Sequence, residues 1–167
     1  MNKEKKQELN HNTSRYLTFF VDDEQYGLNI VNVKEIIASM NITNVPKTPD
    51  YIKGVINLRG AVIPVIDVRL KFGLAEKKHD VNTAIIINVI DSVSIGFIVD
   101  RVEDVLSLNQ SQLTEAPKFG TSVDTSFIEN VAEVDENVIM ILNLKKIFEQ
   151  DELVDIATME QTQENEQ

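Results

Sequence analysis

The chain contains an internal repeat of short apolar segments, which limits its possible folds more than any other feature. Residues 51–72 align without a gap with residues 127–148, at an offset of 76 and with five identities. Residues 16–37 align in the same way with residues 85–106, at an offset of 69. Chance similarity between two strand-rich stretches is the alternative, but two ungapped alignments in the same order favour duplication of one structural unit.

Each repeat has the composition and patterning of a small β structure. Val, Ile and Phe recur in short runs separated by turn residues, which is typical of strands and hairpins. We expect helical segments at 31–38, 68–72 and 143–150, and strands at 15–21, 25–30, 52–58, 61–66, 83–90, 93–99, 102–108, 128–134 and 138–142. The sequence therefore predicts a mainly β fold of two barrel-like subdomains with roughly five strands each, related by internal duplication.

The length of 167 residues fits about one folded domain. We expect a disordered N-terminal arm at residues 1–14, a folded body at 15–150 with its subdomain boundary near 73–81, and an acidic tail at 151–167 that is disordered. From residue 149 onward there are seven acidic side chains and no basic one. Most of the net charge of −11 therefore belongs to the tail rather than to the folded body.

Composition excludes several classes of function. An acidic chain with a pI near 4.6 is unsuited to nucleic acid or to an anionic membrane surface. The chain has no Cys, so it has neither disulfides nor thiol chemistry. It shows no signal peptide and no apolar run long enough to span a membrane, so we expect a soluble, cytoplasmic protein without direct membrane insertion.

The sequence offers no catalytic constellation. The two His residues, His11 and His79, lie in polar segments without partners at ligand spacing, so we expect no catalytic residues, no metal site, no cofactor and no enzymatic activity. Asp67 and Asn143 occupy equivalent positions before the short helices, where an N-cap role explains both. The neighbouring Asp100 and Arg101 are better interpreted as a local ion pair than as catalytic groups.

Comparison of the two repeats singles out Arg59. The hairpin turn carries Arg59 in the first repeat and Asp135 at the equivalent position in the second. A fold requirement for Arg would apply to both repeats, so Arg59 is a candidate for recognition of a partner's carboxylates or backbone, with a solvated turn residue as the equal alternative. The segment at 30–37 has more apolar positions than one buried face needs, which makes it a second candidate interface.

The same residues carry a resemblance to a known family. The stretch from Pro49 to Asp67 reads P-x-x-I-x-G-V-x-N-L-R-G-x-x-I-P-V-x-D, and the stretch from Gly96 to Leu106 reads G-x-x-V-D-x-V-x-x-V-L. Together with the sequence YLTFFVDDEQYGLNIVNVKEII near the N-terminus, these resemble the CheW family of bacterial chemotaxis coupling proteins. The resemblance covers about Arg15 to Phe148, and the acidic tail has no counterpart in the shared pattern.

The resemblance implies a fold of two SH3-like barrels and a non-catalytic adaptor role. Such an adaptor links the cytoplasmic tips of methyl-accepting chemoreceptors to the regulatory domain of the chemotaxis histidine kinase, within arrays at the membrane. The receptor hairpin would dock in a groove between the subdomains, as helix-in-groove recognition. The resemblance places Val33, Glu35, Arg59 and, on the second-barrel wall, Val99 at this receptor site.

The resemblance also places Ile42 and Thr43 towards the kinase-binding face of the first barrel. Two other functions stay open at this point. A relative serving a chemosensory pathway unrelated to motility would have the same sequence pattern. A small-ligand-binding or enzymatic β-barrel protein would need a concave site with convergent polar groups, for which the sequence gives no evidence.

Overall fold

The computed structural model describes residues 13–116, 126–148, 152 and 155–158. These residues divide into two compact units. Unit 1 consists of Met1–Val31 and Glu103–Ile147, and unit 2 consists of Asn32–Val102 and Phe148–Gln167. The chain therefore passes from one unit to the other three times, and residues 73–81, where the sequence predicts a boundary, lie within unit 2.

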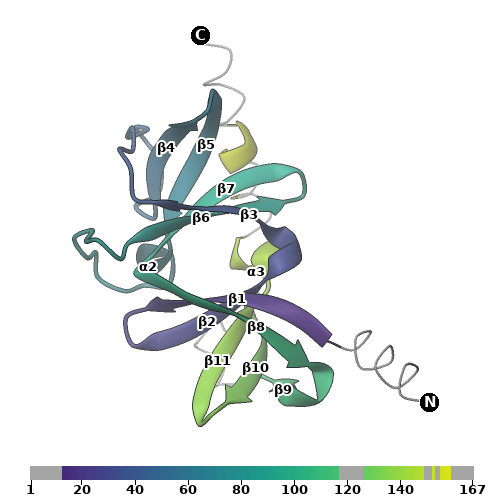
Figure 1. Cartoon of the computed structure of the whole chain (residues 1–167). Coiled ribbons are helices and arrows are strands. Elements are labelled where there is room, and N and C mark those ends of the chain that lie inside the picture. Colours follow the sequence, from purple (N-terminus) through teal and green to yellow (C-terminus); the bar gives the residue numbers. More distant parts are fainter. Residues whose placement is uncertain (1–12, 117–125, 149–151, 153–154, 159–167) are drawn as a thin grey trace. The chain divides into compact units, whose positions relative to one another are not determined.

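Unit 1 is built on a six-stranded sheet with the strand order β8-β1-β2-β11-β10-β9 (Figure 1). Neighbouring pairs β1–β2, β10–β11 and β9–β10 are antiparallel, whereas β2 and β11 run parallel. The strands are β1 (Thr13–Val21), β2 (Glu24–Asn29), β8 (Arg101–Asn109), β9 (Leu113–Glu115), β10 (Ile128–Val134) and β11 (Asn137–Leu142). A sixth strand was not expected, because β9 has only three residues and no alternating pattern of its own.

Unit 2 is built on a five-stranded sheet with the order β3-β6-β7-β5-β4. Here too the antiparallel hairpins β6–β7 and β4–β5 are joined by a parallel pair, β5 with β7. The strands are β3 (Val33–Ala38), β4 (Ile52–Leu58), β5 (Ala61–Asp67), β6 (Ala84–Ile90) and β7 (Val93–Val99). The bridge between Thr43 and Val55 extends the sheet beyond β4, as β9 extends the sheet of unit 1 beyond β10.

The two repeats exchange hairpins. The β1–β2 hairpin of the first repeat pairs with β11 of the second, and the β6–β7 hairpin of the second repeat pairs with β5 of the first. The parallel ladders are equivalent, since Gly27 lies opposite Ile141 in unit 1 and Gly96 lies opposite Val65 in unit 2. Each unit therefore contains strands from both repeats, and the shared order of pairings agrees with duplication.

Each unit has its own apolar core. In unit 1 the core contains Tyr16, Leu108, Ala132, Ile139 and Ile141, and in unit 2 it contains Ile56, Ile63, Val65, Ile85, Ile87 and Ile98. Aromatic pairs add to both, with Phe19 stacked on Tyr26 at 5.7 Å and Phe97 edge-on to Phe148 at 6.2 Å between ring centroids. Pairs of this kind contribute about 1 kcal/mol beyond their buried area.

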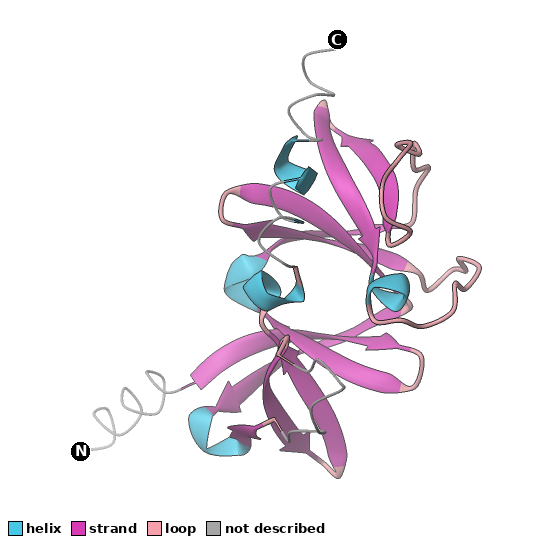
Figure 2. Ribbon diagram, turned by 180° about the vertical axis from the view of Figure 1, so that it is seen from behind, coloured by secondary structure: helices cyan, strands magenta, loops and turns pink. Residues whose placement is uncertain are grey.

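The helices are all short (Figure 2). They include α2 (Val68–Lys71), α3 (Leu144–Ile147) and the 3₁₀ turns η1 (Ile30–Asn32) and η2 (Gln110–Gln112). The helix expected at 31–38 is wrong, because that segment forms η1 followed by strand β3. Its apolar side chains at 33, 36 and 37 fit a strand as well as a helix, and pairing with β6 decides between the two. No helix among the described residues is long and apolar enough to cross a membrane.

The chain ends depart from the expected disorder. Residues 13 and 14, expected in the N-terminal arm, belong to β1, while residues 1–12 lie outside the described part. In the segment expected as a disordered tail, residues 152 and 155–158 are helical and Ile156 is fully buried. Glu152 accepts a hydrogen bond from Lys71 Nζ at 2.6 Å and one from the Tyr51 hydroxyl. Apolar anchoring of Ile156 thus orders part of an otherwise acidic segment.

Both helix caps are confirmed. The Asp67 carboxylate accepts a hydrogen bond from the Arg69 backbone N–H at 2.9 Å, and Asn143 Oδ1 accepts one from the Lys145 N–H at 3.1 Å. Burial raises the pKa of Asp67, against the lowering effect of its hydrogen bonds with the backbone of residues 69 and 70. The folded state consequently binds a proton at Asp67 more readily than the unfolded state does.

The linkage gives a test at Asp67. A carboxyl whose pKa is higher in the folded state contributes more to stability as the pH falls through that pKa. The unfolding free energy of the wild type is therefore expected to rise relative to that of Asp67→Asn between pH 7 and pH 4, in paired urea titrations. Asp67→Ala also loses the cap, which costs about 1 kcal/mol at either pH. If the difference in unfolding free energy between the wild type and Asp67→Asn were independent of pH, this account would be contradicted.

Candidate functional site

The most prominent polar feature of unit 2 is an ion pair between Glu35 and Arg59. Glu35 lies on β3, at one edge of the sheet, and Arg59 lies in the β4–β5 turn at the other edge. The Arg59 guanidinium holds the carboxylate with both terminal nitrogens, Nη1 to Oε1 at 3.0 Å and Nη2 to Oε2. The pair therefore brings the two edges of the sheet together at this end of unit 2.

The turn that carries Arg59 is formed by two residues with positive φ, Arg59 at 50° and Gly60 at 89°. This is the backbone of a type I′ hairpin turn, which matches the twist of the flanking strands. The Gly60 N–H donates to Asn57 Oδ1 at 3.0 Å and fixes the turn. The equivalent turn of unit 1 has the same geometry, with Asp135 at 48° and Glu136 at 68°.

The electrostatics of the pair fit a surface open to a partner. The hydrogen bond from Arg59 lowers the pKa of Glu35, and the same bond raises the pKa of Arg59. The Arg59 side chain remains 68% exposed and that of Glu35 27% exposed. A guanidinium that is partly exposed can donate hydrogen bonds to a further carboxylate or carbonyl oxygen. It can also exchange its present carboxylate partner for one on another protein.

Half-buried apolar side chains lie close in sequence to both members of the ion pair, and together they are called the apolar layer. Ile37 of β3, Leu58 of β4 and Ile42 all pack, half-buried, against the core cluster of unit 2. Beside them Ile36 is 44% exposed. The sequence predicted exposed apolar side chains in this segment, and Ile36 together with Val31 of unit 1 confirms it, whereas Ile37 belongs to the core.

The other residues expected at the receptor site lie along the same β3–β6–β7 ladder but are not gathered at one point. Val33 is half-buried and pairs with Asn88, next to a bulge that separates it from Glu35. Val99 pairs with Ala84, which in turn pairs with Ala38 at the opposite end of β3. Val99 is only 1% exposed. The structure thus joins Glu35 and Arg59 and leaves Val99 buried at the far end of the ladder.

Ile42 and Thr43 lie at the β4 edge. The Thr43 backbone exchanges two hydrogen bonds with Val55, each of 2.9 Å, and its side chain is exposed. Ile42 inserts its side chain between this edge and the core cluster. The backbone pairing fixes both residues on the sheet, so the Thr43 side chain is presented from a rigid edge.

Sequence reasoning missed the ion pair and a hollow in unit 1. Arg59 was singled out by comparing the repeats and Glu35 only by resemblance, while their contact depends on how the sheet curves. The hollow measures about 410 Å³ and has carboxylates on its rim. The sequence did contain one signal for the hollow, which is the opposite charge of Arg59 and Asp135 at equivalent turn positions of the two repeats. Among the described residues no group of carboxylate and His side chains is arranged to hold a metal ion.

Comparison with known proteins gives consistent matches. The family model described as "CheW-like domain" matches residues 15–152. Chemotaxis protein CheW of Klebsiella aerogenes is 35% identical over 83% of this chain and 83% of its own length, and that of Bacillus subtilis is 33% identical over 82% and 88%. The crystal structure of scaffolding protein TtCheW from Thermoanaerobacter tengcongensis is 38% identical, covers 81% of this chain and 92% of its own, and has a TM-score of 0.74.

Proposed function

The chain belongs to the CheW-like family of chemotaxis proteins, and on this premise we propose that it is a non-catalytic adaptor coupling chemoreceptors to the chemotaxis histidine kinase. In this role it works at the cytoplasmic side of receptor arrays in the membrane. It holds receptor tips and the regulatory domain of the kinase in a geometry through which receptor conformation biases kinase activity. The observation that carries this proposal is the bidentate Glu35–Arg59 pair, whose Arg59 side chain is 68% exposed.

We assign receptor docking to the end of unit 2 that carries Glu35 and Arg59. A receptor hairpin is an amphipathic helical surface, and it needs both apolar contact and polar orientation. Ile37, on the same face of β3 as Glu35, supplies half-buried apolar area, and the ion pair supplies a planar set of donors with a carboxylate beside it. Val33 contributes from the same strand. Val99, being buried, contributes by shaping the sheet rather than by contact.

Kinase docking is assigned to the β4 edge at Ile42 and Thr43. Thr43 pairs with Val55 in the middle of β4, away from the β4–β5 turn that carries Arg59, so both partners can bind unit 2 at the same time. The two-way hydrogen bonding of Thr43 with Val55 gives the edge the rigidity that a scaffold needs. Rigid presentation lowers the entropy lost on binding.

Arg59→Asp is expected to weaken receptor binding at least about tenfold, since a buried or half-buried charge partner at an interface is worth 1.4 kcal/mol or more. The second repeat already has Asp at this turn position, at a φ of 48°, so the fold accepts the change. The measurement is co-sedimentation with receptor-bearing membranes. In the same variant, NMR titration should show a higher pKa for Glu35, because its lowering by Arg59 is removed.

Lys47→Asp is the matched control. Lys47 is also an exposed cation of unit 2 with positive φ, at 64°, but it lies outside the Glu35–Arg59 surface. Its reversal should leave receptor binding unchanged. Equal binding by wild type and folded Arg59→Asp protein would refute the assignment of the receptor surface.

A further inference from the structure

The hollow in unit 1 occupies the place that the Glu35–Arg59 surface occupies in unit 2. Val134 pairs with Asn137 at the β10–β11 turn, as Leu58 pairs with Ala61 at the β4–β5 turn. Phe20 pairs with Gln25 in β1–β2, as Val89 pairs with Ser94 in β6–β7. In the alignment, the offset of 76 makes Asp135 equivalent to Arg59. The offset of 69 makes Asp104 equivalent to Glu35 and Glu103 equivalent to Lys34.

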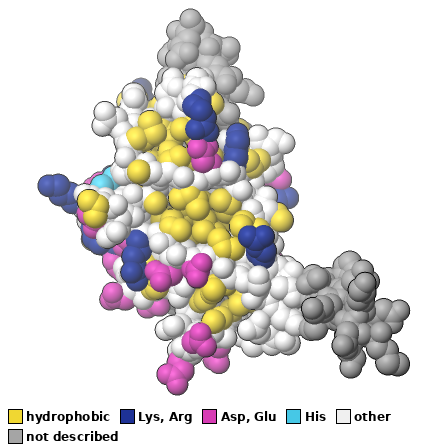
Figure 3. Space-filling view, viewed as in Figure 1, with side chains coloured by type: hydrophobic (Ala, Val, Ile, Leu, Met, Phe, Trp, Pro, Cys, Tyr) yellow, Lys and Arg dark blue, Asp and Glu magenta, His cyan; other side chains and the backbone are white. Residues whose placement is uncertain are grey.

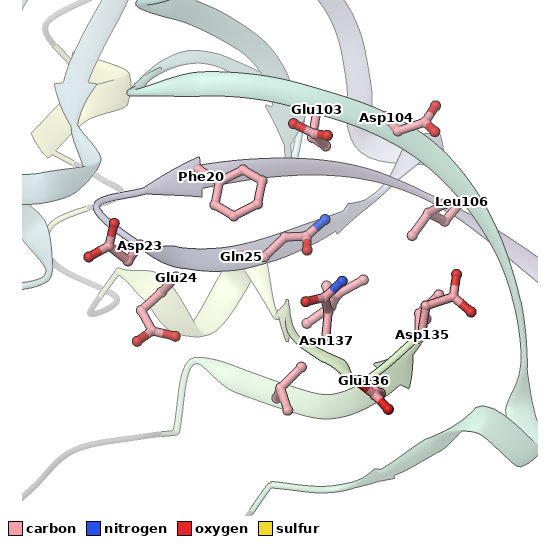
Figure 4. A pocket seen from close by; sticks show the side chains of 13 residues that line it. Phe20, Asp23, Glu24, Gln25, Glu103, Asp104, Leu106, Asp135, Glu136 and Asn137 are labelled. Atoms are coloured by element: carbon pink, nitrogen blue, oxygen red, sulfur yellow. The ribbon is translucent and has the colours of Figure 1, made fainter.

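The two equivalent surfaces differ in the sign of their charge. Where unit 2 has Lys34 and Arg59, unit 1 has Glu103 and Asp135. Six carboxylates and no basic side chain line the hollow, namely Asp23, Glu24, Glu103, Asp104, Asp135 and Glu136. Figure 4 shows them on three separate segments around the hollow, from the β1–β2 turn, from the start of β8 and from the β10–β11 turn.

Apolar as well as charged side chains line the hollow, and the apolar part of the lining is called its floor. Phe20, Leu106, Val134, Val138 and Ile139 line it, and Val138 is 51% exposed. The wall formed by β8 is held in place, because the buried Thr18 hydroxyl donates to the Asp104 carbonyl at 2.9 Å and accepts from the Asp104 N–H at 3.2 Å. A preformed hollow with an apolar floor and a charged rim is suited to one anchored side chain with charged neighbours.

The charge difference extends over both units. The described residues of unit 1 include ten acidic and three basic side chains, whereas those of unit 2 include nine acidic and nine basic ones. In Figure 3 carboxylates gather over the strands of unit 1. A field of one sign attracts partners of the opposite sign and repels those of its own.

We infer that the hollow of unit 1 is a second docking surface, which binds a Lys/Arg-rich protein segment through one apolar anchor on the Phe20–Val138 floor. It is the charge-inverted counterpart of the Glu35–Arg59 surface. Its partner is therefore distinct in charge from that of unit 2, and the chain presents two surfaces that cannot compete for one ligand. The inference rests on the geometry of unit 1 and does not depend on the receptor assignment in unit 2.

The test uses the full chain, isotopically labelled, without kinase or receptor. The probe is a capped peptide of four Lys-Arg-Leu repeats, with a Glu-Glu-Leu peptide of the same length as comparison. The basic peptide should shift amide resonances at residues 103–106 and 134–139. Binding should weaken as salt rises from about 0.05 to about 0.5 M, since screening acts on exposed charges.

Asp135→Arg should weaken binding of the basic peptide at least about tenfold, which corresponds to one strong interfacial charge contact. Arg59 shows that the fold accepts Arg at this turn position, at a φ of 50°. Asp91→Arg is the matched control, because Asp91 has the same backbone geometry, at a φ of 49°, and lies in a turn outside the hollow. It should weaken binding less than about twofold.

Several outcomes would overturn the inference. They are equal weakening by Asp135→Arg and Asp91→Arg, equal binding of the basic and acidic peptides, and peptide shifts confined to unit 2. A response of residues 103–106 and 134–139 to Ca²⁺ without any response to the peptide would also overturn it. Because receptor and kinase are absent, none of these results bears on the adaptor role.

Discussion

Replacing Gly54 with alanine is expected to lower the unfolding free energy by about 4 kcal/mol, a large share of the 5–15 kcal/mol typical of a domain. A Cβ at this position would lie 1.9 Å from the Thr43 carbonyl oxygen and 2.7 Å from its carbonyl carbon. Both belong to the Thr43 carbonyl group, whose oxygen accepts a hydrogen bond from the Val55 N–H at 2.9 Å, so they cannot move without disturbing the bridge. Gly54 also has a φ of 140°, which L side chains rarely adopt.

Urea unfolding of Gly54→Ala measures this effect, and Gly60→Ala separates its two causes. Gly60 also has positive φ, at 89°, but no atom lies within 4 Å of its expected Cβ. Its replacement should cost about 1 kcal/mol, from backbone strain alone. If both variants were destabilised equally, the contact with Thr43 would not be the cause. Because Thr43 lies in the proposed kinase surface, Gly54→Ala should also weaken kinase binding in any fraction that folds.

Replacing Arg69 with methionine is expected to destabilise the protein by about 3 kcal/mol. The Arg69 Nη1 donates to Asp100 Oδ2 at 2.8 Å, and its Nε donates to the Ala75 carbonyl at 2.8 Å. The two side chains are only 11% and 13% exposed. Removing the guanidinium leaves the Asp100 carboxylate in a poorly hydrated place without this cation, so less of its desolvation cost is compensated.

A double-mutant cycle with Asp100→Leu tests the mechanism. If the cost arises from the carboxylate, the double variant Arg69→Met/Asp100→Leu should be more stable than Arg69→Met alone. The exposed ion pair of Lys53 with Glu76 is the control, with side chains 24% and 62% exposed. Lys53→Met should cost less than about 1 kcal/mol, as exposed pairs do. Equal effects of Arg69→Met and Lys53→Met would contradict the account.

Much of the fold follows from patterns in the sequence. Alternation and turn residues located the hairpins, and the repeat predicted two β subdomains related by duplication. The segment at 33–38 was misassigned, because its apolar positions satisfy a helix and a strand alike and only its pairing with β6 distinguishes them. The exchange of hairpins could not be predicted. By local pattern, the β1–β2 hairpin could pair in parallel with β5 of its own repeat or with β11 of the other repeat. Long-range packing selects β11.

The candidate site was only partly predictable. The sequence alone, through Asp135 at the position equivalent to Arg59, marked Arg59 as a candidate binding residue, with a solvated turn residue as the equal alternative. The structure was needed to identify the partner of Arg59, because Glu35 is 24 residues away and lies on the other edge of the sheet. Asp100 was interpreted as part of a local ion pair or hydrogen-bonding element with Arg101, and its ion pair with Arg69, 31 residues away, was not expected. Pairings of this kind depend on tertiary contacts rather than on local pattern.

The exchanged hairpins tie the two proposed surfaces to one folding equilibrium. Neither repeat contains a complete sheet, so neither is a folding unit by itself, and each sheet exists only while both repeats are ordered. A change that destabilises β5 or β11 therefore also destabilises the strands of the other repeat that pair with it. The two copies can diverge freely in the charge of their turns, as Arg59 and Asp135 have done, but not in the stability of their strands. A scaffold built this way keeps both of its faces or loses both together.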